Sequence, residues 1–257
     1  MREILNCENI SLNYHSKTDE IAAVRDLSFR VYDGEFVSII GPSGCGKTTI
    51  LSMISGILPP TSGNIRIDGK EVTGPSKEIG YMLQKDQLFP WRNIYQNVII
   101  GLEIQHTKTP EALAVADDLL KKYGLWDFRN KYPGELSGGM KQRVALIRTL
   151  VLNPKILLLD EPFSALDYQT RLKVTNDVYN IIKTEKKTAI LITHDISESI
   201  SMSDRILVLT KRPARLCAEH KCEFDGILPT KRRESVDFPK TFDKIWREIS
   251  NEEDEEE

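Results

Sequence analysis

The chain has 257 residues, of which 28% are charged and 40% hydrophobic, and its net charge is −3 at pH 7. Such a composition is that of an ordinary globular protein, long enough to bury a substantial core. Six carboxylates occupy positions 252–257, so the remaining residues carry a net charge of +3. A balance this close to neutral argues against a strongly basic surface, and we expect no nucleic acid partner.

The cysteines and the apolar segments indicate the cellular compartment in which the chain is expected. Its four cysteines are scattered and include no CxxC pair, which favours reduced thiols over a zinc or redox site. No apolar segment has the length of a signal-peptide core or the roughly eighteen residues of a membrane span. We therefore expect a cytosolic chain that is neither exported nor membrane-spanning, with any membrane association made through a partner.

Two kinds of strand pattern occur along the chain. Alternating segments near the N-terminus are separated by turns and predict a smaller antiparallel sheet, at 4–13, 22–31 and 64–67. Later runs are short, continuous and apolar, as in strands buried on both faces of a parallel sheet, at 36–40, 156–159, 189–192 and 206–209. Helical stretches follow Gly46 and occupy 171–185, so the alternation predicts an α/β fold.

The middle and the end of the chain follow other patterns. Residues from about 86 to 152 are predicted to form a helical insert, in which one helix begins at Pro110 and another ends at Asn153. We expect this insert to interrupt a main domain spanning residues 1–216. The C-terminal part is expected to divide into an extension at 217–250, with an amphipathic helix at 242–249, and a disordered acidic tail at 251–257.

Residues 41–49 read GPSGCGKTT and match the phosphate-binding pattern GxxxxGK[ST] between a buried strand and a helix. Its glycines allow the backbone to curl, so that amides and the helix N-terminus face the phosphates. Lys47 is expected to reach the β- and γ-phosphates, and the Thr48 hydroxyl to ligate Mg²⁺. We expect the whole segment, the P-loop, to bind the nucleotide: Gly41, Pro42, Ser43, Gly44, Cys45, Gly46, Lys47, Thr48 and Thr49.

Polar side chains end two of the apolar runs. Asp160 and Glu161 follow the run at 156–159, and His194 follows the run at 189–192. At the carboxyl ends of parallel strands, such side chains face the ligand crevice. Asp160 is suited to hold Mg²⁺, Glu161 to polarise an attacking water as general base, and His194 to hydrogen-bond the γ-phosphate or that water. The other histidines lack this context and are expected at the surface: His15, His106 and His220.

A second turn resembles a phosphate site. Residues 134–150 read GELSGGMKQRVALIRTL, a glycine-rich turn that opens a helix about a hundred residues after the P-loop. Together, GPSGCGKTT, LSGGMKQR, ILLLDEP, SALD and His194 resemble the ATPase subunit of ATP-binding cassette (ABC) transporters over roughly residues 4–210. This resemblance implies a head-to-tail homodimer, in which the P-loop of one subunit and the LSGG turn of the other hold one ATP.

The resemblance also implies roles for single residues. Ser137, Gly138 and Gly139, the signature turn, would contact the γ-phosphate of the partner's ATP. Gln84 would approach Mg²⁺ and the attacking water, and would link the core to the helical insert. Residues 164–167, the D-loop, would cross the dimer interface. Tyr14 sits where the family has an aromatic ring stacked on adenine, and the alternative for Tyr14 is a packed core tyrosine.

Two further segments are similar to the nitrate, sulfonate and taurine importer branch of the family: LFPWRN at 88–93 and KRPAR at 211–215. Phe89, Pro90 and Trp91 are expected to be exposed and to suit a pocket for a partner's short helix. The resemblance thus implies an ATP hydrolase on the cytoplasmic face of the membrane, attached peripherally. Two membrane permease subunits would bind it, and an extracytoplasmic solute-binding protein would deliver the solute.

Three other functions fit the sequence less well. A soluble cassette ATPase of translation or DNA repair would show two cassettes or a long coiled-coil insertion, and the chain shows neither. An exporter more often fuses its membrane helices to the cassette, although separate exporter ATPase subunits exist. A cassette that only binds nucleotide would lack the catalytic carboxylate or the histidine, whereas Glu161 and His194 are both present.

Overall fold

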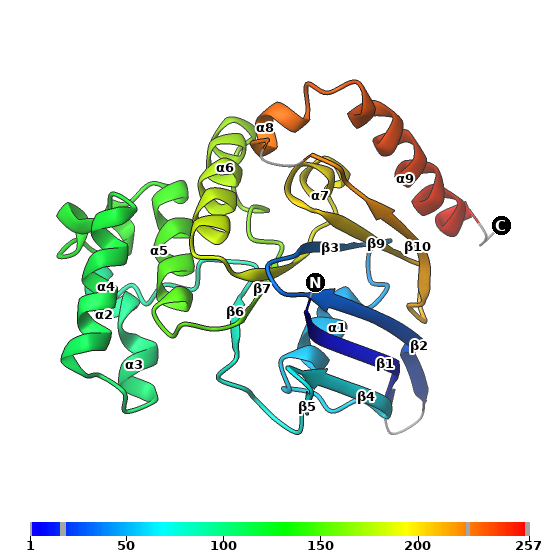
Figure 1. Ribbon diagram of the computed structural model, residues 1–257, viewed down its shortest axis with the longest axis horizontal. Coiled ribbons are helices and arrows are strands. Elements are labelled where there is room, and N and C mark those ends of the chain that lie inside the picture. Colours follow the sequence, from blue (N-terminus) through cyan, green and yellow to red (C-terminus); the bar gives the residue numbers. More distant parts are fainter. Residues whose placement is uncertain (1, 16–18, 225–226, 255–257) are drawn as a thin grey trace.

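The computed structural model describes residues 2–15, 19–224 and 227–254, and its elements form two sheets with flanking helices (Figure 1). The larger sheet has six strands in the order β10-β9-β3-β8-β7-β6, and the smaller has four in the order β2-β1-β4-β5. The predicted α/β fold, with an antiparallel N-terminal sheet and a helical insert, is therefore confirmed.

The larger sheet contains the four predicted apolar runs, now β3 (Phe36–Ile40), β7 (Ile156–Asp160), β8 (Thr188–Ile192) and β9 (Arg205–Leu209), each buried along its whole length. These four strands and β6 (Ile79–Met82) pair in parallel. Strand β10 (Leu216–Lys221) pairs antiparallel with β9 at one edge. Apolar side chains on both faces are needed because helices cover the sheet from both sides.

The smaller sheet is antiparallel and consists of β1 (Glu3–His15), β2 (Glu20–Tyr32), β4 (Ser62–Ile67) and β5 (Lys70–Glu71). Helix α1 (Lys47–Ile54) packs between this sheet and the larger one. Its buried residues Ile50, Leu51 and Ile54 join strands of both sheets in one core cluster. The start of α1, and with it the P-loop, is thereby fixed where the two sheets meet.

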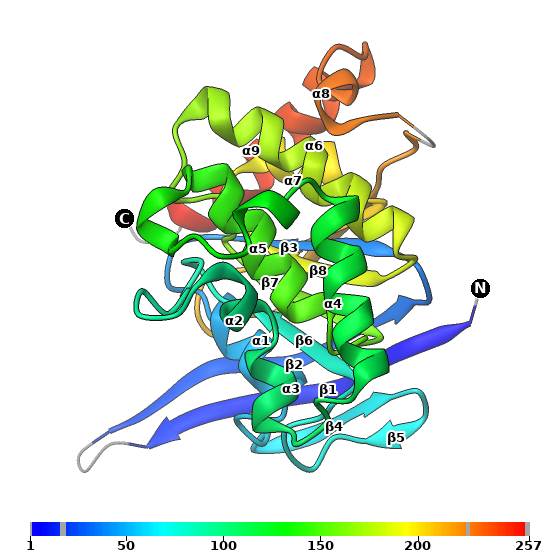
Figure 2. The same ribbon diagram turned by 90° about the vertical axis from the view of Figure 1, so that its left-hand side faces the viewer.

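The helical insert lies at one end of the molecule, on the left in Figure 1, and faces the viewer in Figure 2. It contains α2 (Ile94–Val98), α3 (Ile100–Ile104), α4 (Pro110–Lys122) and α5 (Gly138–Leu150). Two short 3₁₀ helices, Trp126–Phe128 and Pro133–Glu135, lie between α4 and α5. Helix α5 contacts α6 (Tyr168–Thr184), and both belong to the cluster that covers one face of the larger sheet. The insert is thus anchored to the core through α5.

After β8, the described residues form the helices α7 (Ile196–Met202), α8 (Pro229–Arg232) and α9 (Asp237–Asp254). Phe238 and Ile245 of α9 pack against α7 and β9, so the boundary predicted after residue 216 cuts through β10. Residues 251–254 are helical, which corrects the predicted disordered tail, while residues 255–257 lie outside the described residues. Glutamate is a good helix former, and extending an existing helix is easier than starting one.

The prediction that His220 lies at the surface is wrong. His220 is only 8% exposed, and its Nε2 lies 2.6 Å from Glu248 Oε2 on α9. The residue is in the edge strand β10, which α9 covers, so its burial depends on a segment far along the chain. His15 and His106 are exposed, as predicted.

All four cysteines are free thiols, and Cys217 alone among them is exposed. Among the residues that the structure describes, no helix combines the length and apolar character needed to cross a bilayer.

Candidate active site

The P-loop closes around the ammonium group of Lys47. Lys47 Nζ donates hydrogen bonds to the carbonyl oxygens of Gly41 and Pro42, each at 2.8 Å, and the residue is 8% exposed. Gly46 has φ of +122°, and a Cβ there would lie 2.9 Å from the Ala23 carbonyl oxygen. Only glycine fits this position. The loop therefore holds a positive charge beside the N-terminus of α1, which is the arrangement that binds phosphate groups.

Asp160 ends β7 beside the P-loop and is the predicted metal-binding carboxylate. It is 7% exposed, and its Oδ2 accepts a hydrogen bond from the Tyr81 hydroxyl at 3.3 Å. The Thr48 side chain lies near this carboxylate. Burial raises the pKa of Asp160 above its ordinary value, and the charge of Glu161 adds to the rise. A hydroxyl beside a buried carboxylate is the oxygen donor set that Mg²⁺ prefers, so these residues fit the ion.

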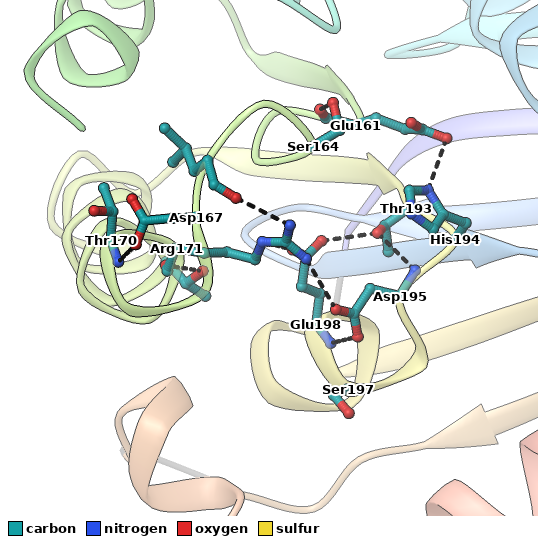
Figure 3. Close-up of polar contacts among 12 residues, drawn as sticks. Glu161, Ser164, Asp167, Thr170, Arg171, Thr193, His194, Asp195, Ser197 and Glu198 are labelled. Carbon is teal, nitrogen blue, oxygen red and sulfur yellow. Dashed lines mark hydrogen bonds and ion pairs between the residues drawn. The ribbon is translucent and has the colours of Figure 1, made fainter. Parts of the chain in front are cut away.

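Three predicted catalytic residues come together at Glu161. Its Oε1 lies 3.2 Å from His194 Nδ1 (Figure 3), and its Oε2 accepts a hydrogen bond from Gln84 Nε2 at 3.1 Å. Glu161 directly follows β7, and the other two follow β8 and β6, its neighbours on either side in the sheet. The strand order therefore explains the meeting of residues that lie far apart in sequence.

The backbone of Glu161 is strained, with φ of +43°. For a residue other than glycine, such a conformation costs on the order of 1–3 kcal/mol and persists only where neighbours enforce it. Here the Glu161 amide donates to the Ile192 carbonyl at 2.8 Å, and the Glu161 carbonyl accepts from the amide and hydroxyl of Ser164 at 3.2 and 3.0 Å. These bonds hold the carboxylate toward His194.

The signature turn opens α5, where Ser137 is the N-cap and its hydroxyl accepts a hydrogen bond from the Met140 amide at 3.4 Å. Ser137 and Gly138 are exposed at a groove of about 610 Å³, which the D-loop and α6 also line. Within the described part of the chain, none of residues 41–49 lines this groove. The two phosphate-type turns thus belong to different parts of the surface.

Gly138 allows close packing between the signature turn and the D-loop. A Cβ on Gly138 would lie 2.8 Å from Leu166 Cδ2, closer than carbon atoms approach without a shift. Leu166 is 9% exposed, whereas its neighbours Ala165 and Asp167 are exposed. The D-loop is therefore fixed at Leu166 and presents the residues on either side of it.

Tyr14 lies beside the P-loop. Its hydroxyl is 3.1 Å from Thr49 Oγ1, and the residue is 44% exposed, so it is not a packed core tyrosine. Tyr14 comes from β1 and Thr49 from α1, and their contact sets the ring next to the loop predicted to bind phosphates. An exposed aromatic ring beside a phosphate-binding loop is suited to stack on a base.

Replacing Tyr14 with alanine is expected to weaken ATP binding by roughly tenfold, because stacking of one base on an aromatic ring is worth on the order of 1–3 kcal/mol. Titration calorimetry with ATP and Mg²⁺ measures the change. Tyr132→Ala is the matched control, because Tyr132 is 50% exposed but belongs to the helical insert. Equal affinities in the Tyr14 variant and the unaltered chain would show that the ring does not contact the base.

The aromatic loop, residues 88–93, follows Gln84. Asn97 is fully buried and organises it: the Asn97 side chain accepts from the Phe89 amide at 2.7 Å and donates to the carbonyls of Phe89, Arg92 and Asn93 at 3.0–3.1 Å. Trp91 is nevertheless 72% exposed, with its ring 5.2 Å from that of Phe89. A large aromatic surface is thus held in a fixed conformation and left open to solvent, as in preformed binding sites.

Arg148 of α5 fixes the segment before the aromatic loop. Its guanidinium donates to the carbonyl oxygens of Asp86 and Gln87, both at 2.7 Å. Burial lowers the pKa of Arg148. The helix that begins at the signature turn is therefore bonded directly to the chain between Gln84 and Trp91.

No role was predicted from the sequence for several side chains of the site. Tyr81 bonds to Asp160, and Asn97 organises the aromatic loop. Asp195 caps α7 by accepting from the Glu198 amide at 3.0 Å, and the spacing of these two acids in DISE is a helix-capping pattern visible in the sequence. For Tyr81 and Asn97 no local pattern gives such a signal.

A phosphate-binding loop between strand and helix, with carboxylates at the ends of neighbouring parallel strands, defines the class of P-loop nucleoside triphosphatases. Within that class, residues 24–164 match the family model described as ABC transporter, and the chain belongs to this family. It is accordingly an ATP-binding and ATP-hydrolysing subunit of the ABC type.

Individual relatives support this membership. The chain is 46% identical over 252 residues to the ABC transporter ATP-binding protein YtlC of Bacillus subtilis, covering 96% of each. It is 40% identical to the taurine import ATP-binding protein TauB of Roseobacter denitrificans, covering 86% of this chain and 82% of TauB. A dimeric post-hydrolysis state of the ATP-binding cassette MJ0796, bound to ADP and Pi, superimposes with a TM-score of 0.72 at 30% identity, covering 86% of this chain and 99% of the other.

Proposed function

We propose that the chain is the ATPase subunit of an importer and works as a homodimer with two ATP molecules at the interface. The observation that carries this proposal is the convergence of Glu161, Gln84 and His194 beside the P-loop, while the signature turn lies on another part of the surface. The signature turn, a second phosphate-type turn, gains a function if it completes the nucleotide site of a second protomer. The dimeric cassette to which the chain is similar supports the same arrangement.

Each residue has a stated part in hydrolysis. Lys47 and the P-loop amides bind the phosphates, and Tyr14 stacks on adenine. The Thr48 hydroxyl and Asp160 would hold Mg²⁺, which would neutralise charge on the phosphates.

Glu161 accepts the proton of the attacking water. Gln84, bonded to the same carboxylate, orients that water, and His194 donates a hydrogen bond to the γ-phosphate. The products ADP and phosphate leave when the protomers separate. In this proposal residues 1–216 form the ATPase domain, with the insert at about 86–152.

The aromatic loop is the proposed contact with the membrane partners. Its fixed backbone and its exposed Trp91 suit a site that receives a short helix from each of two permease subunits, and Arg148 ties the segment just before the loop to α5. This places the chain peripherally at the cytoplasmic face of the membrane. An extracytoplasmic solute-binding protein would deliver the solute to the permease.

Trp91→Ala is expected to weaken permease binding by roughly tenfold or more while ATP affinity stays unchanged, since buried tryptophans dominate the energy of interfaces. Co-purification with the permease subunits, followed by titration in detergent, measures the effect. Trp246→Ala is the matched control, because Trp246 is 57% exposed on α9, outside the aromatic loop. Undiminished co-purification of the Trp91 variant would contradict this docking site.

Import of a small anionic or zwitterionic solute of the taurine, sulfonate or nitrate kind is the proposed purpose, supported by the similarity to taurine import ATP-binding proteins. Cells that lack this chain are expected to lose uptake of one of these labelled solutes and to regain it on re-expression. Accumulation of the same solutes inside the deleted cells would instead indicate an exporter.

A further inference from the structure

Arg171, on the first turns of α6, joins two segments of the site that are far apart in sequence (Figure 3). One guanidinium nitrogen donates to the Leu166 carbonyl of the D-loop at 3.1 Å, and the other lies 3.4 Å from Asp195 Oδ2. Its third nitrogen, Nε, lies 3.8 Å from Glu198 Oε1, which is an ion pair but not a hydrogen bond. A single side chain therefore contacts both the D-loop and the residue after His194.

The side chains that Arg171 contacts also form hydrogen bonds with the residues on either side of His194. Glu198 is 3% exposed and accepts a hydrogen bond from Thr193 Oγ1 at 2.8 Å, and the same hydroxyl accepts from the Asp195 amide at 3.0 Å. Thr193 and Asp195 are the residues on either side of His194, and both are fixed by this network (Figure 3). The His194 side chain itself is 59% exposed and pairs with Glu161.

The other end of the network reaches the signature turn. Leu166, whose carbonyl Arg171 binds, packs against Gly138 so closely that a Cβ on Gly138 would lie 2.8 Å from it. A continuous series of contacts thus runs from the signature turn through Leu166 and Arg171 to the loop of His194. Charged hydrogen bonds inside a partly buried network are stronger and more directional than those at the surface.

We propose that Arg171 is a positioning residue that couples the signature turn and D-loop to His194, so that contact with a partner's nucleotide sets the geometry of this subunit's own catalytic histidine. The inference rests on the proposed function, because it assumes that His194 acts on the γ-phosphate and that the D-loop lies at a dimer interface. Arg171 touches neither reacting atoms nor nucleotide, so its effect passes through Leu166 and Asp195.

The test compares Arg171→Met with Lys183→Met in the full chain. Lys183 lies on the same helix and also contacts a carboxylate, Asp204 at 2.9 Å, and a backbone carbonyl, Gly34 at 3.4 Å, but no part of the site. Arg171→Met is expected to lower kcat about tenfold with the KM for ATP unchanged, and Lys183→Met to leave both unchanged. Arg171→Lys keeps the charge but has one nitrogen for two partners, so its kcat should fall between.

A double-mutant cycle distinguishes coupling from general loss of stability. Asp195→Asn keeps an oxygen to cap α7 but removes the charge beside Arg171, and should lower kcat about threefold. The double variant Arg171→Met/Asp195→Asn should be no slower than Arg171→Met alone, because one interaction is lost only once. If Arg171→Met does not fold, Asp195→Asn and Arg171→Lys carry the same test.

Any one of three results would overturn the coupling. These are a wild-type kcat in Arg171→Met, an equal loss of kcat in Arg171→Met and Lys183→Met, or a double variant whose loss of kcat is the product of the two single losses. The variants Glu161→Gln and His194→Ala separate this failure from failure of the proposed function. If those two variants hydrolyse ATP at the normal rate, both proposals are overturned. If they are inactive while Arg171→Met is fully active, only the coupling is overturned.

Discussion

Glu161→Gln is expected to lower ATP turnover by about 10²–10⁴-fold, the usual contribution of a positioned general base, while ATP still binds. Glutamine has the shape of glutamate but cannot accept the proton of the attacking water. The side-chain oxygen can still accept from Gln84 Nε2, and the backbone bonds that hold position 161 at φ of +43° do not involve the side chain. Binding should survive because Lys47 and the P-loop amides are untouched.

The same variant tests the dimer. With hydrolysis blocked, the nucleotide between a P-loop and a signature turn remains intact, so saturating ATP and Mg²⁺ should convert the Glu161→Gln chain to a dimer in light scattering. Glu78→Gln is a suitable control, because the Glu78 carboxylate forms a surface ion pair with Lys155 at 2.9 Å. A Glu161→Gln chain that stays monomeric and hydrolyses ATP at the normal rate would remove Glu161 from the mechanism.

The fold was predictable from the sequence where burial is continuous. The runs that became β3, β7, β8 and β9 are apolar at nearly every position, because each is covered on both faces. The edge strand β10 was not predicted, because its burial is not continuous. Its sequence LCAEHK is polar and mostly exposed, and only its pairing with β9 makes it a strand.

The candidate site was predictable where a local pattern marks a strand end. Glu161 and His194 follow apolar runs, and the parallel sheet brings both to the same edge. The position of Gln84 agrees with its predicted one, although its catalytic role, like the roles of the other site residues, stays a prediction. The roles predicted for Gln84 and Tyr14 come from the resemblance to a family, because the spacing of residues does not indicate them.

Contacts between distant segments explain the remaining differences. His220 is buried because α9 folds over β10, and Arg171 contacts both the D-loop and the loop of His194 although these two segments are far apart in sequence. Neither residue stands in a pattern of neighbouring residues that indicates its environment. Such long-range placement depends on how whole elements pack, which the periodicity of a single segment does not determine.

Lys47→Ala is expected to weaken ATP binding by roughly ten- to a hundredfold, since hydrogen bonds to charged groups contribute on the order of 1.5–3 kcal/mol each. Lys47 is the buried cation of the P-loop, held by the carbonyl oxygens of Gly41 and Pro42. Its removal takes away the charge opposite the phosphates and also frees these two carbonyl groups. Residual binding should remain, because the backbone amides at the start of α1 still face the phosphates.

Titration calorimetry distinguishes loss of the cation from loss of the loop. Lys155→Ala removes a lysine whose ion pairs with Asp68 and Glu78 lie at the surface, and it should bind ATP as the unaltered chain does. Lys47→Arg keeps the charge, but its larger planar head does not fit between two carbonyls 2.8 Å from Nζ, so its affinity should also fall. Normal affinity in Lys47→Ala would mean that phosphate recognition lies elsewhere, because no other lysine ammonium in the described residues is enclosed by the carbonyls of this loop.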